Sequence, residues 1–538
     1  MTTTPDPLSW PASNERTLGA MLRNAAQVHA GKTFAVFPDS QLTYTAFDAL
    51  VDRVAAGLRA QGLRKGSKLA IMLPNCVEFL ALWFACARIG AVEVPINVSF
   101  RGPLLKHVIH HSDAEMVVVA GSLATHLELV AAELPTLRTV VLLGDPEQPV
   151  RLPFRQLAYG QLPAEAAEPV TETVLADDPV AIIFTSGTTG PSKGALLSHN
   201  YFWWFAERSW ALRGEQGDER LYTCLPLFHA NAQVLTALAA LVRGHVAVID
   251  THFTASGFWE RLRGFGATQF NYIGGMIPIL MKQPPGGRDR EHAVRLALGA
   301  AAPREQWRSF EERFGLRILE CYGQTEDCAV TANTLDTARI GSIGKEGWGY
   351  EMQVVDDHDR PVPTGTVGEF VVRPRAPGLL MLGYYKMPEE TLQVLRNLWF
   401  HTGDYGSQDA DGFFWFKDRK KDAIRRRGEN ISAFEVEMVV NQHPAVLESA
   451  VYAVPSEVGE DDVMVALVLQ PGQQLAPADL LRHCERRLAY FAMPRYVDIR
   501  PELPKTPTHR IEKYRLRQQG ITPGTWDRER AGYQLQRR

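Results

Sequence analysis

From about residue 40 to 330, hydrophobic positions alternate between helical and strand-like spacing. Apolar side chains at helical spacing over Thr45–Ala60 predict an amphipathic helix. A strand is expected over Ser67–Leu73, and the more uniformly apolar segments Val77–Ile89 and Ala91–Pro95 predict a buried helix and a buried strand. Further buried strands are expected over Met116–Ala120, Thr139–Leu143, Pro179–Phe184, His245–Ile249 and Arg317–Glu320. Strands that alternate with helices predict parallel sheets covered by helices on both faces.

The spacing changes after about residue 335, where short strands such as Met352–Val355 and Gly368–Val372 predict a small β subdomain. A charged run, Lys417–Arg427, interrupts this pattern, and a solvated face is one interpretation of it. Beyond the run we expect a compact α+β unit, with helices near 433–442 and 476–488 and strands near 447–454 and 462–470.

We therefore predict an α/β protein with a large N-terminal domain over residues 1–420, built of parallel-rich sheets flanked by helices plus the small β subdomain. A small, mobile α+β domain over residues 422–538 is expected after a hinge at Lys421. Residues 145–178 are rich in Pro, Glu and Ala and are expected to form a surface excursion.

Composition narrows the class of protein. The 538 residues carry a net charge of −4, which gives no electrostatic argument for binding nucleic acid. The most apolar stretch, Phe79–Ile96, is interrupted by Arg88 and Glu93, so no membrane span is expected. The six cysteines show no metal-ligand spacing, and together with the lack of a signal peptide they indicate a cytoplasmic protein.

The most informative motif is the run Thr185–Gly194, Thr-Ser-Gly-Thr-Thr-Gly-Pro-Ser-Lys-Gly, which follows a predicted strand. Glycines let backbone N–H groups approach a ligand, while hydroxyl groups and Lys193 supply further donors, so the run is typical of a loop that grips a polyphosphate. Two residues separate Gly190 from Lys193, whereas the common nucleotide-hydrolase loop has lysine directly after the last glycine. A flexible surface turn is the alternative interpretation.

Five further motifs follow this loop in order: Tyr322-Gly-Gln-Thr-Glu326, His401-Thr-Gly-Asp404, Asp418-Arg-Lys-Lys-Asp422, Gly428-Glu-Asn-Ile431 and Pro504-Lys-Thr-Pro-Thr-His-Arg510. Together they resemble the adenylate-forming superfamily of acyl-CoA synthetases, luciferases and adenylation domains, and the stretch Ile424–Ser432 is similar to carnitine and crotonobetaine CoA ligases. The resemblance implies two half-reactions. A carboxylate attacks the α-phosphate of ATP to give acyl-AMP and pyrophosphate, and a thiol, usually coenzyme A, then displaces AMP.

The resemblance also implies roles for individual residues. Glu326 would bind Mg²⁺ beside the α-phosphate, and Lys193 would contact the phosphates. Asp404 would accept hydrogen bonds from the ribose, and Arg419 would lie near the ribose and phosphate. The full set of residues expected to bind ATP is Thr185, Ser186, Gly187, Thr188, Thr189, Gly190, Lys193, Gly299, Ala300, Ala301, Tyr322, Gly323, Thr325, Asp404 and Arg419.

Two further groups of residues are expected to meet the other substrates. Gly428, Glu429 and Arg427 would border coenzyme A, and its phosphates would be met by Arg425, Arg426 and Arg427. The acyl pocket is expected to include Trp204, His229, Tyr272, Gly274 and Gly275, with His229 beside the reacting carboxylate. A betaine is one option for the acid, because aromatic faces can hold a quaternary ammonium; core packing is the other explanation for the aromatic residues.

The main departure from the superfamily is near the C-terminus, where its usual Gly-Lys pair is replaced by His509 and Arg510. Arg510 keeps a positive charge and is our prediction for the adenylation cation, with Lys513 as the alternative. We therefore predict an acid–coenzyme A ligase that depends on ATP and Mg²⁺, with a homodimer as one option for its assembly. Transfer of the acyl group to an amine or a carrier protein, or a non-catalytic nucleotide-binding protein, are the alternatives.

Overall fold

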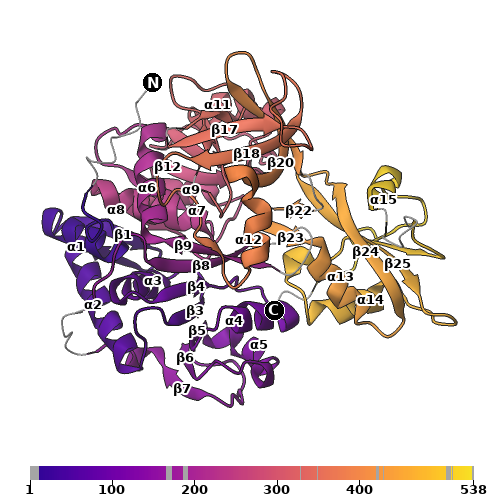
Figure 1. The fold of residues 1–538 in the computed structure, drawn as a ribbon, viewed down its shortest axis with the longest axis horizontal. Coiled ribbons are helices and arrows are strands. Elements are labelled where there is room, and N and C mark those ends of the chain that lie inside the picture. The colour runs from indigo at the N-terminus through magenta and orange to yellow at the C-terminus, as the bar shows by residue number, and fades with distance from the viewer. Residues whose placement is uncertain are drawn as a thin grey trace.

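The structure is a computed structural model that describes residues 11–164, 172–185, 192–327, 329–347, 349–419, 423–427, 429–504, 511 and 513–535. Residues 11–419, here called the N-terminal unit, form the larger body, and residues 423–535, the C-terminal unit, project from one side of it (Figure 1). Buried side chains of the C-terminal unit form clusters of their own, and Phe100 is a residue of the N-terminal unit that packs against one of them. The predicted hinge at Lys421 lies outside the described residues and stays a prediction.

One sheet of the N-terminal unit has eight strands among the described residues, in the order β19-β9-β8-β4-β3-β5-β6-β7. Successive side chains of β3 point to opposite faces of this sheet, and helices cover both faces. Leu69 and Ile71 belong to the same hydrophobic cluster as side chains of α3, whereas Ala70 and Met72 belong to the same cluster as side chains of α4. The strands are β3 (Lys68–Met72), β4 (Val92–Pro95), β5 (Met116–Ala120), β6 (Thr139–Leu143), β7 (Arg155–Ala158), β8 (Pro179–Thr185), β9 (Lys193–Ser198) and β19 (Gly383–Tyr384).

The second sheet has thirteen strands among the described residues, with parallel pairs at one end and antiparallel pairs at the other. The strands predicted to form a small β subdomain continue this sheet, since β16 pairs with both β15 and β21. Its strands are β1 (Thr33–Phe37), β2 (Ser40–Thr43), β10 (Arg220–Thr223), β11 (Val246–Ile249), β12 (Gln269–Ile273), β13 (Leu296–Ala300), β14 (Arg317–Tyr322), β15 (Thr331–Ala332), β16 (Gly344–Glu346), β17 (Tyr350–Val355), β18 (Gly368–Pro374), β20 (Phe400–Gln408) and β21 (Phe413–Arg419).

Helices cover these sheets, and their ends follow local capping rules. Thr43 and Ser198 accept hydrogen bonds from the first-turn N–H groups of α2 and α6, and Gly90 ends α3 in the left-handed conformation at φ 70°. The main helices are α1 (Leu18–Val28), α2 (Tyr44–Ala60), α3 (Val77–Ile89), α4 (Gly102–His111), α5 (Ala124–Glu128), α6 (His199–Arg213), α7 (Ala230–Ala232), α8 (Ala239–Arg243), α9 (Phe258–Phe265), α10 (Met276–Met281), α11 (Arg304–Phe314) and α12 (Pro388–Val394).

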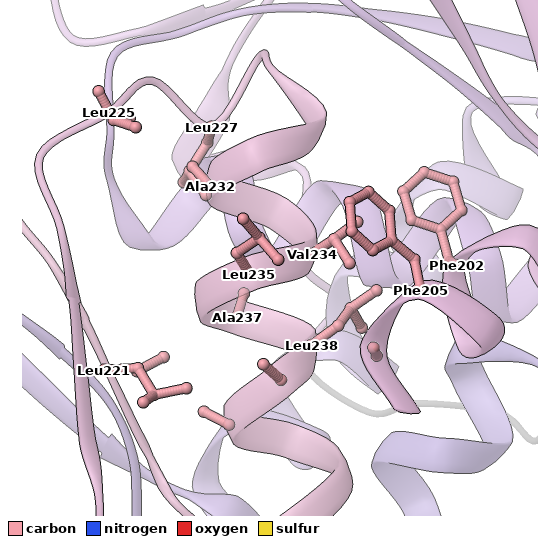
Figure 2. Close-up of a cluster of buried hydrophobic side chains, with 14 of the residues drawn as sticks. Phe202, Phe205, Leu221, Leu225, Leu227, Ala232, Val234, Leu235, Ala237 and Leu238 are labelled. Atoms are coloured by element: carbon pink, nitrogen blue, oxygen red, sulfur yellow. The ribbon is translucent and has the colours of Figure 1, made fainter. Parts of the chain in front are cut away.

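The aromatic helix α6 packs against a π-helical segment, η5 (Gln233–Leu238), that continues α7. Figure 2 shows Phe202 and Phe205 of α6 beside Val234 and Leu238 of η5. These side chains are at most 9% exposed, so core packing accounts for most of the aromatic residues of α6. The π-helical turn places one edge of this core next to the cavity described below, since both Phe205 and Leu235 line it.

The C-terminal unit has a four-stranded sheet among its described residues, in the order β24-β25-β26-β27. A two-stranded ribbon, β22 paired with β23, leads into it from the N-terminal unit. Its elements are β22 (Ala423–Arg426), β23 (Glu429–Ser432), α13 (Ala433–Asn441), β24 (Val446–Pro455), β25 (Asp461–Leu469), α14 (Pro477–Glu485), β26 (Tyr496–Arg500), α15 (Lys513–Gln519) and β27 (Trp526–Asp527).

The predicted α/β class is confirmed, with one difference in detail. Residues 155–158, inside the expected surface excursion, form β7 at the edge of a sheet. The two charges that interrupt the most apolar stretch are both buried, and Arg88 is paired with Asp48 and Asp52. Among the described residues, no helix has the length and apolar character that crossing a membrane requires.

Candidate active site

A cavity of about 1560 Å³ lies between the two units. Its walls come from the ends of β8, β9 and β13, from the segment after β14, from β20, and from the C-terminal unit, where Arg425, Arg427 and Glu429 line it. Pockets for one drug-sized ligand usually measure ~300–1,000 Å³, so this cavity has room for more than one substrate.

One corner of the cavity gathers a cation, a carboxylate and two hydroxyl groups. Antiparallel pairing of β8 with β9 places Thr185 opposite Lys193. The Thr185 hydroxyl donates to Oε1 of Glu326 at 3.2 Å, and the Tyr384 hydroxyl donates to the same oxygen at 2.8 Å. The Lys193 Nζ lies 4.8 Å from the centroid of the Tyr384 ring. Such a set suits a polyphosphate with a divalent cation.

The rest of the predicted phosphate loop lies outside the described residues, namely Ser186, Gly187, Thr188, Thr189 and Gly190. Gly323 and Thr325, from the segment that follows β14, line the cavity beside Glu326 as expected. Three predicted phosphate-side residues, Thr185, Lys193 and Glu326, are therefore brought together by the fold, although they come from segments about 140 residues apart.

A second corner is built around Asp404 of β20, which is 2% exposed. Oδ2 of Asp404 accepts hydrogen bonds from the Tyr322 hydroxyl and from Nε2 of Gln324, each at 2.8 Å. These two donors fix the orientation of the Asp404 carboxylate. A fixed orientation is what a carboxylate needs in order to bind the hydroxyl groups of a ribose. Tyr322 supports Asp404 and is not among the residues that line the cavity, so a direct contact of Tyr322 with ATP has no support in this arrangement. The backbone of Arg419 lies opposite Asp404 in the sheet, and its side chain is outside the description.

The end of β13 carries Gly299 and Ala300, two of the residues predicted to bind ATP, and both line the cavity just before a tight turn. Ala301 has φ 65°, a conformation that costs a residue with a Cβ some energy. The turn is held by Glu320, a residue that the sequence analysis did not single out. Its carboxylate accepts the N–H groups of Ala301 and Ala302 at 2.8 and 3.0 Å. Burial raises the pKa of Glu320 to about 7, while these two hydrogen bonds act to lower it.

The predicted acyl-pocket residues separate into two groups. His229 and Gly275 line the cavity, whereas Trp204, Tyr272 and Gly274 lie behind its wall. A Cβ added to Gly274 would meet the Ala301 carbonyl oxygen at 2.3 Å, so this glycine permits close backbone packing. Apolar side chains that sequence analysis did not name line the cavity instead, including Phe205, Leu225, Phe228, Leu235, Ile273 and Met276.

The C-terminal unit closes the cavity with Arg425, Arg427 and Glu429. Oε2 of Glu429 lies 3.2 Å from Nε2 of His229 and 3.5 Å from Nδ2 of Asn97. Gly428, the predicted neighbour of coenzyme A, lies outside the described residues.

Arg426 contradicts two expectations for the charged run. It is 3% exposed, donates to the carbonyl oxygens of Phe491 and Met493, and pairs with Asp462 at 3.0 Å. It is therefore neither part of a solvated face nor available to a phosphate of coenzyme A, because alternation along β22 turns it into the core of the C-terminal unit.

The two candidates for the adenylation cation have different outcomes. Arg510 lies outside the described residues. Lys513 pairs with Glu437 of α13 at 2.6 Å, within the C-terminal unit, and does not line the cavity.

A metal ion in this cavity would find a carboxylate at Glu326. Within the described ranges, no three histidine, cysteine, aspartate or glutamate side chains gather as a metal site. A single carboxylate, Glu326, beside the phosphate corner fits Mg²⁺, which is usually bound by one or two carboxylates plus substrate phosphates.

Comparison with known proteins identifies the family. The model of the AMP-binding enzyme family matches residues 22–385, and that of the AMP-binding enzyme C-terminal domain matches residues 435–510. The crotonobetaine/carnitine–CoA ligase of Salmonella typhimurium is 32% identical over 517 residues, which cover 93% of this chain and 99% of that protein.

Solved structures agree with this result. ATP-bound MatB from Rhodopseudomonas palustris is 27% identical, with a TM-score of 0.68, and the match covers 94% of this chain and 98% of that one. The o-succinylbenzoate CoA synthetase of Bacillus subtilis, at 23% identity, shares the fold with a TM-score of 0.81 over 93% of this chain and 98% of that one. Since the two family models together reach from Leu22 to the residues around the last motif, the chain belongs to the AMP-binding enzyme family.

Proposed function

We propose that the protein is a carboxylic acid–coenzyme A ligase that uses ATP and proceeds through an acyl-adenylate. The observation that carries this proposal is that Lys193, Glu326 and Asp404 line the same cavity as Arg425, Arg427 and Glu429 of the C-terminal unit. Nucleotide, acid and thiol have to meet in one place for acyl transfer through AMP, and the cavity has the volume for this. The CoA ligases among the relatives favour this function over amine transfer and over a non-catalytic protein.

In the first half-reaction, an oxygen of the acid forms a bond to the α-phosphorus of ATP, and the bond to pyrophosphate breaks. Lys193 would hold the phosphates, Asp404 would orient the ribose, and Thr185 and Tyr384 keep the Glu326 carboxylate in place. When bound, Mg²⁺ would lie beside Glu326 and supply charge neutralisation to the phosphates. The acid itself is the nucleophile, so the protein contributes position and charge.

In the second half-reaction, the thiol sulfur bonds to the acyl carbon, and AMP leaves with the electron pair of the broken bond. We place the entry of the thiol at Arg427 and Glu429, where the C-terminal unit borders the cavity. The His229–Glu429 contact spans the two units at this point. It would orient the imidazole beside the reacting carbonyl group.

The acid is proposed to be apolar in its body. Among the described residues that line the cavity, the carboxylates are Glu326, Glu369, Asp404 and Glu429, and each has a hydrogen-bond or ion-pair partner around the nucleotide corners or at His229. A quaternary ammonium bound among the apolar lining residues would therefore have none of the described carboxylates of the cavity as its partner. A betaine is the second candidate, supported by the name of the Salmonella relatives.

Pyrophosphate exchange tests both the proposed ligase function and the proposed apolar character of the acid. Purified protein is incubated with ATP, Mg²⁺, labelled pyrophosphate and one acid at a time: benzoate, cyclohexanecarboxylate, octanoate, carnitine or crotonobetaine. The proposal expects exchange with at least one apolar acid, and coenzyme A should then convert the acyl-AMP to a thioester. Exchange with the betaines alone would refute the apolar acid, and an acyl-AMP that coenzyme A does not convert to a thioester would refute the ligase assignment.

A further inference from the structure

One stretch of the cavity wall is a π-helical turn. The segment η5 (Gln233–Leu238) contributes Leu235 to the apolar lining, whereas Gln233, its first residue, is 0% exposed and is not among the described residues that line the cavity. π-helical turns are rare and occur frequently at functional sites. The contacts that hold this turn therefore bear on the shape of the cavity.

Buried hydrogen bonds tie η5 to both sheets of the N-terminal unit. Nδ2 of Asn271, in β12 of the thirteen-stranded sheet, donates to Oγ1 of Thr236 at 2.6 Å. Nε2 of Gln233 donates at 2.9 Å to Oε1 of Glu93, in β4 of the eight-stranded sheet. All four side chains are at most 2% exposed. The position of η5 therefore depends on two buried polar pairs, of which Glu93–Gln233 holds the start of the turn.

The chemistry of this pair calls for a proton on the carboxyl group. Oε2 of Glu93 and Oε1 of Gln233 are both buried acceptors with no hydrogen-bond partner among the described residues. Burial raises the pKa of Glu93 well above its ordinary value, and the hydrogen bond from Gln233 acts in the opposite direction. A buried carboxylate without a cation is costly, so Glu93 is a neutral acid. Its O–H group can then donate to Oε1 of Gln233, which satisfies both acceptors and closes a ring of two hydrogen bonds.

We propose that Glu93 and Gln233 form a positioning pair for selection of the acid, which fixes the π-helical turn and so places Leu235 against the body of the acid. The inference rests on the proposed ligase function. Gln233 and Leu235 are two residues apart in one turn, so loss of the pair lets the lining side chain move. The contacts that hold Asp404 and Glu326 do not involve this pair, so the effect should fall on the acid and spare ATP.

Three variants separate the hydrogen-bonded pair from the packing around it. Gln233→Met removes the amide but keeps an unbranched side chain of similar length. Glu93→Gln keeps the ring, because two side-chain amides exchange the same two hydrogen bonds. The double variant Glu93→Leu/Gln233→Met replaces both partners by apolar groups, a change that can be nearly neutral for stability, so it serves if Gln233→Met alone does not fold.

Tyr44→Phe is the matched control. The Tyr44 side chain is 0% exposed, and its hydroxyl group donates to the carbonyl oxygens of Ala240 and His245 at 3.1 and 2.8 Å. Ala240 belongs to α8, which directly follows η5, and neither Tyr44 nor Ala240 is among the described residues that line the cavity. The control therefore loosens the same stretch of helix at a point away from the wall.

Pyrophosphate exchange is measured with the acid of the panel above that the original protein uses best. The KM for this acid is expected to rise at least fivefold in Gln233→Met and in the double variant, while the KM for ATP stays within twofold. Glu93→Gln and Tyr44→Phe should stay within twofold of the original protein in both constants. An unchanged KM for the acid in the double variant, or an equal rise in the KM for ATP, would overturn the inference.

Infrared spectroscopy tests the pair without any turnover. The original protein is expected to show the carbonyl stretch of a protonated carboxyl group, sensitive to exchange into heavy water, that is missing from Glu93→Gln and shifted in Gln233→Met. Identical spectra of the original protein and Glu93→Gln in this region would overturn the inference. Absence of exchange with every acid in the original protein would instead refute the proposed function, and the role in acid selection with it.

Discussion

The two sides of the cavity are built in different ways. On the proposed nucleotide side, Asp404 and Glu326 receive hydrogen bonds from hydroxyl and amide groups of their own unit. On the opposite side, Glu429 and Glu435 contact residues of the other unit, and His229 is partly exposed. The first side is fixed by the fold of one unit, whereas the second exists only while the units are docked. We therefore expect substitutions on the first side to impair adenylation and those on the second to impair thioester formation.

The largest effect is expected from Glu326→Gln. It removes the charge that would hold Mg²⁺ beside the phosphates, and loss of one electrostatic group in an active site typically costs about 10²–10³ in rate. Pyrophosphate exchange should fall by this factor, while thioester formation from supplied acyl-AMP should change by less than about tenfold. Equal losses in both steps would remove the distinction between the two sides.

Arg510→Ala sharpens the comparison, because this residue belongs to the C-terminal unit in sequence but is predicted to serve adenylation. Exchange is expected to fall by roughly 10²–10³, the usual loss for one electrostatic donor, with thioester formation retained. Lys513→Ala is the companion variant. Since Lys513 pairs with Glu437, this substitution is expected to lower the stability of the C-terminal unit and to have little effect on the rate of pyrophosphate exchange. Loss of exchange in Lys513→Ala alone would transfer the predicted role to that lysine.

Glu320 gives the nucleotide side a pH dependence. Its pKa is about 7 in the folded protein and ~4.3 in an unfolded chain. The folded state therefore binds the extra proton, and the contribution of this group to stability, present below pH ~4.3, is lost as the pH rises through about 7. The free energy of unfolding, obtained from urea titrations between pH 4.5 and 8, should fall with rising pH more steeply for the original protein than for Glu320→Gln. The difference over this range should be at most about 3 kcal/mol. The same pH dependence of the unfolding free energy in both proteins would contradict the raised pKa of Glu320.

The smallest effect is expected from Glu429→Gln. The contact between His229 and Glu429 is partly exposed and contributes about 1 kcal/mol at most, so thioester formation should slow by no more than about fivefold, with exchange unchanged. The measurement is the same single turnover from acyl-AMP, with coenzyme A varied. A larger loss in exchange than in thioester formation would show that the contact serves the first half-reaction.

The features that could be predicted from the sequence differ from those that depend on tertiary structure. The fold class and the family are confirmed, and the strands Met116–Ala120 and Thr139–Leu143 have the predicted bounds, because short buried strands carry a strong local signal. Glu326, Lys193 and Asp404 could be named because each belongs to a motif of contiguous residues. The contacts of Glu320 and Glu435 could not, since each depends on backbone N–H groups brought near by tertiary structure. Periodicity also could not tell that Phe205 faces the cavity while its neighbour Trp204 does not.

The most direct test compares Glu326→Gln and Glu429→Gln for both half-reactions in one set of assays, with the same acid. The account predicts that the first variant loses exchange by at least a hundredfold while the second keeps it, and that thioester formation from acyl-AMP is the step that Glu429→Gln slows. Loss of both steps to the same extent in both variants would contradict it.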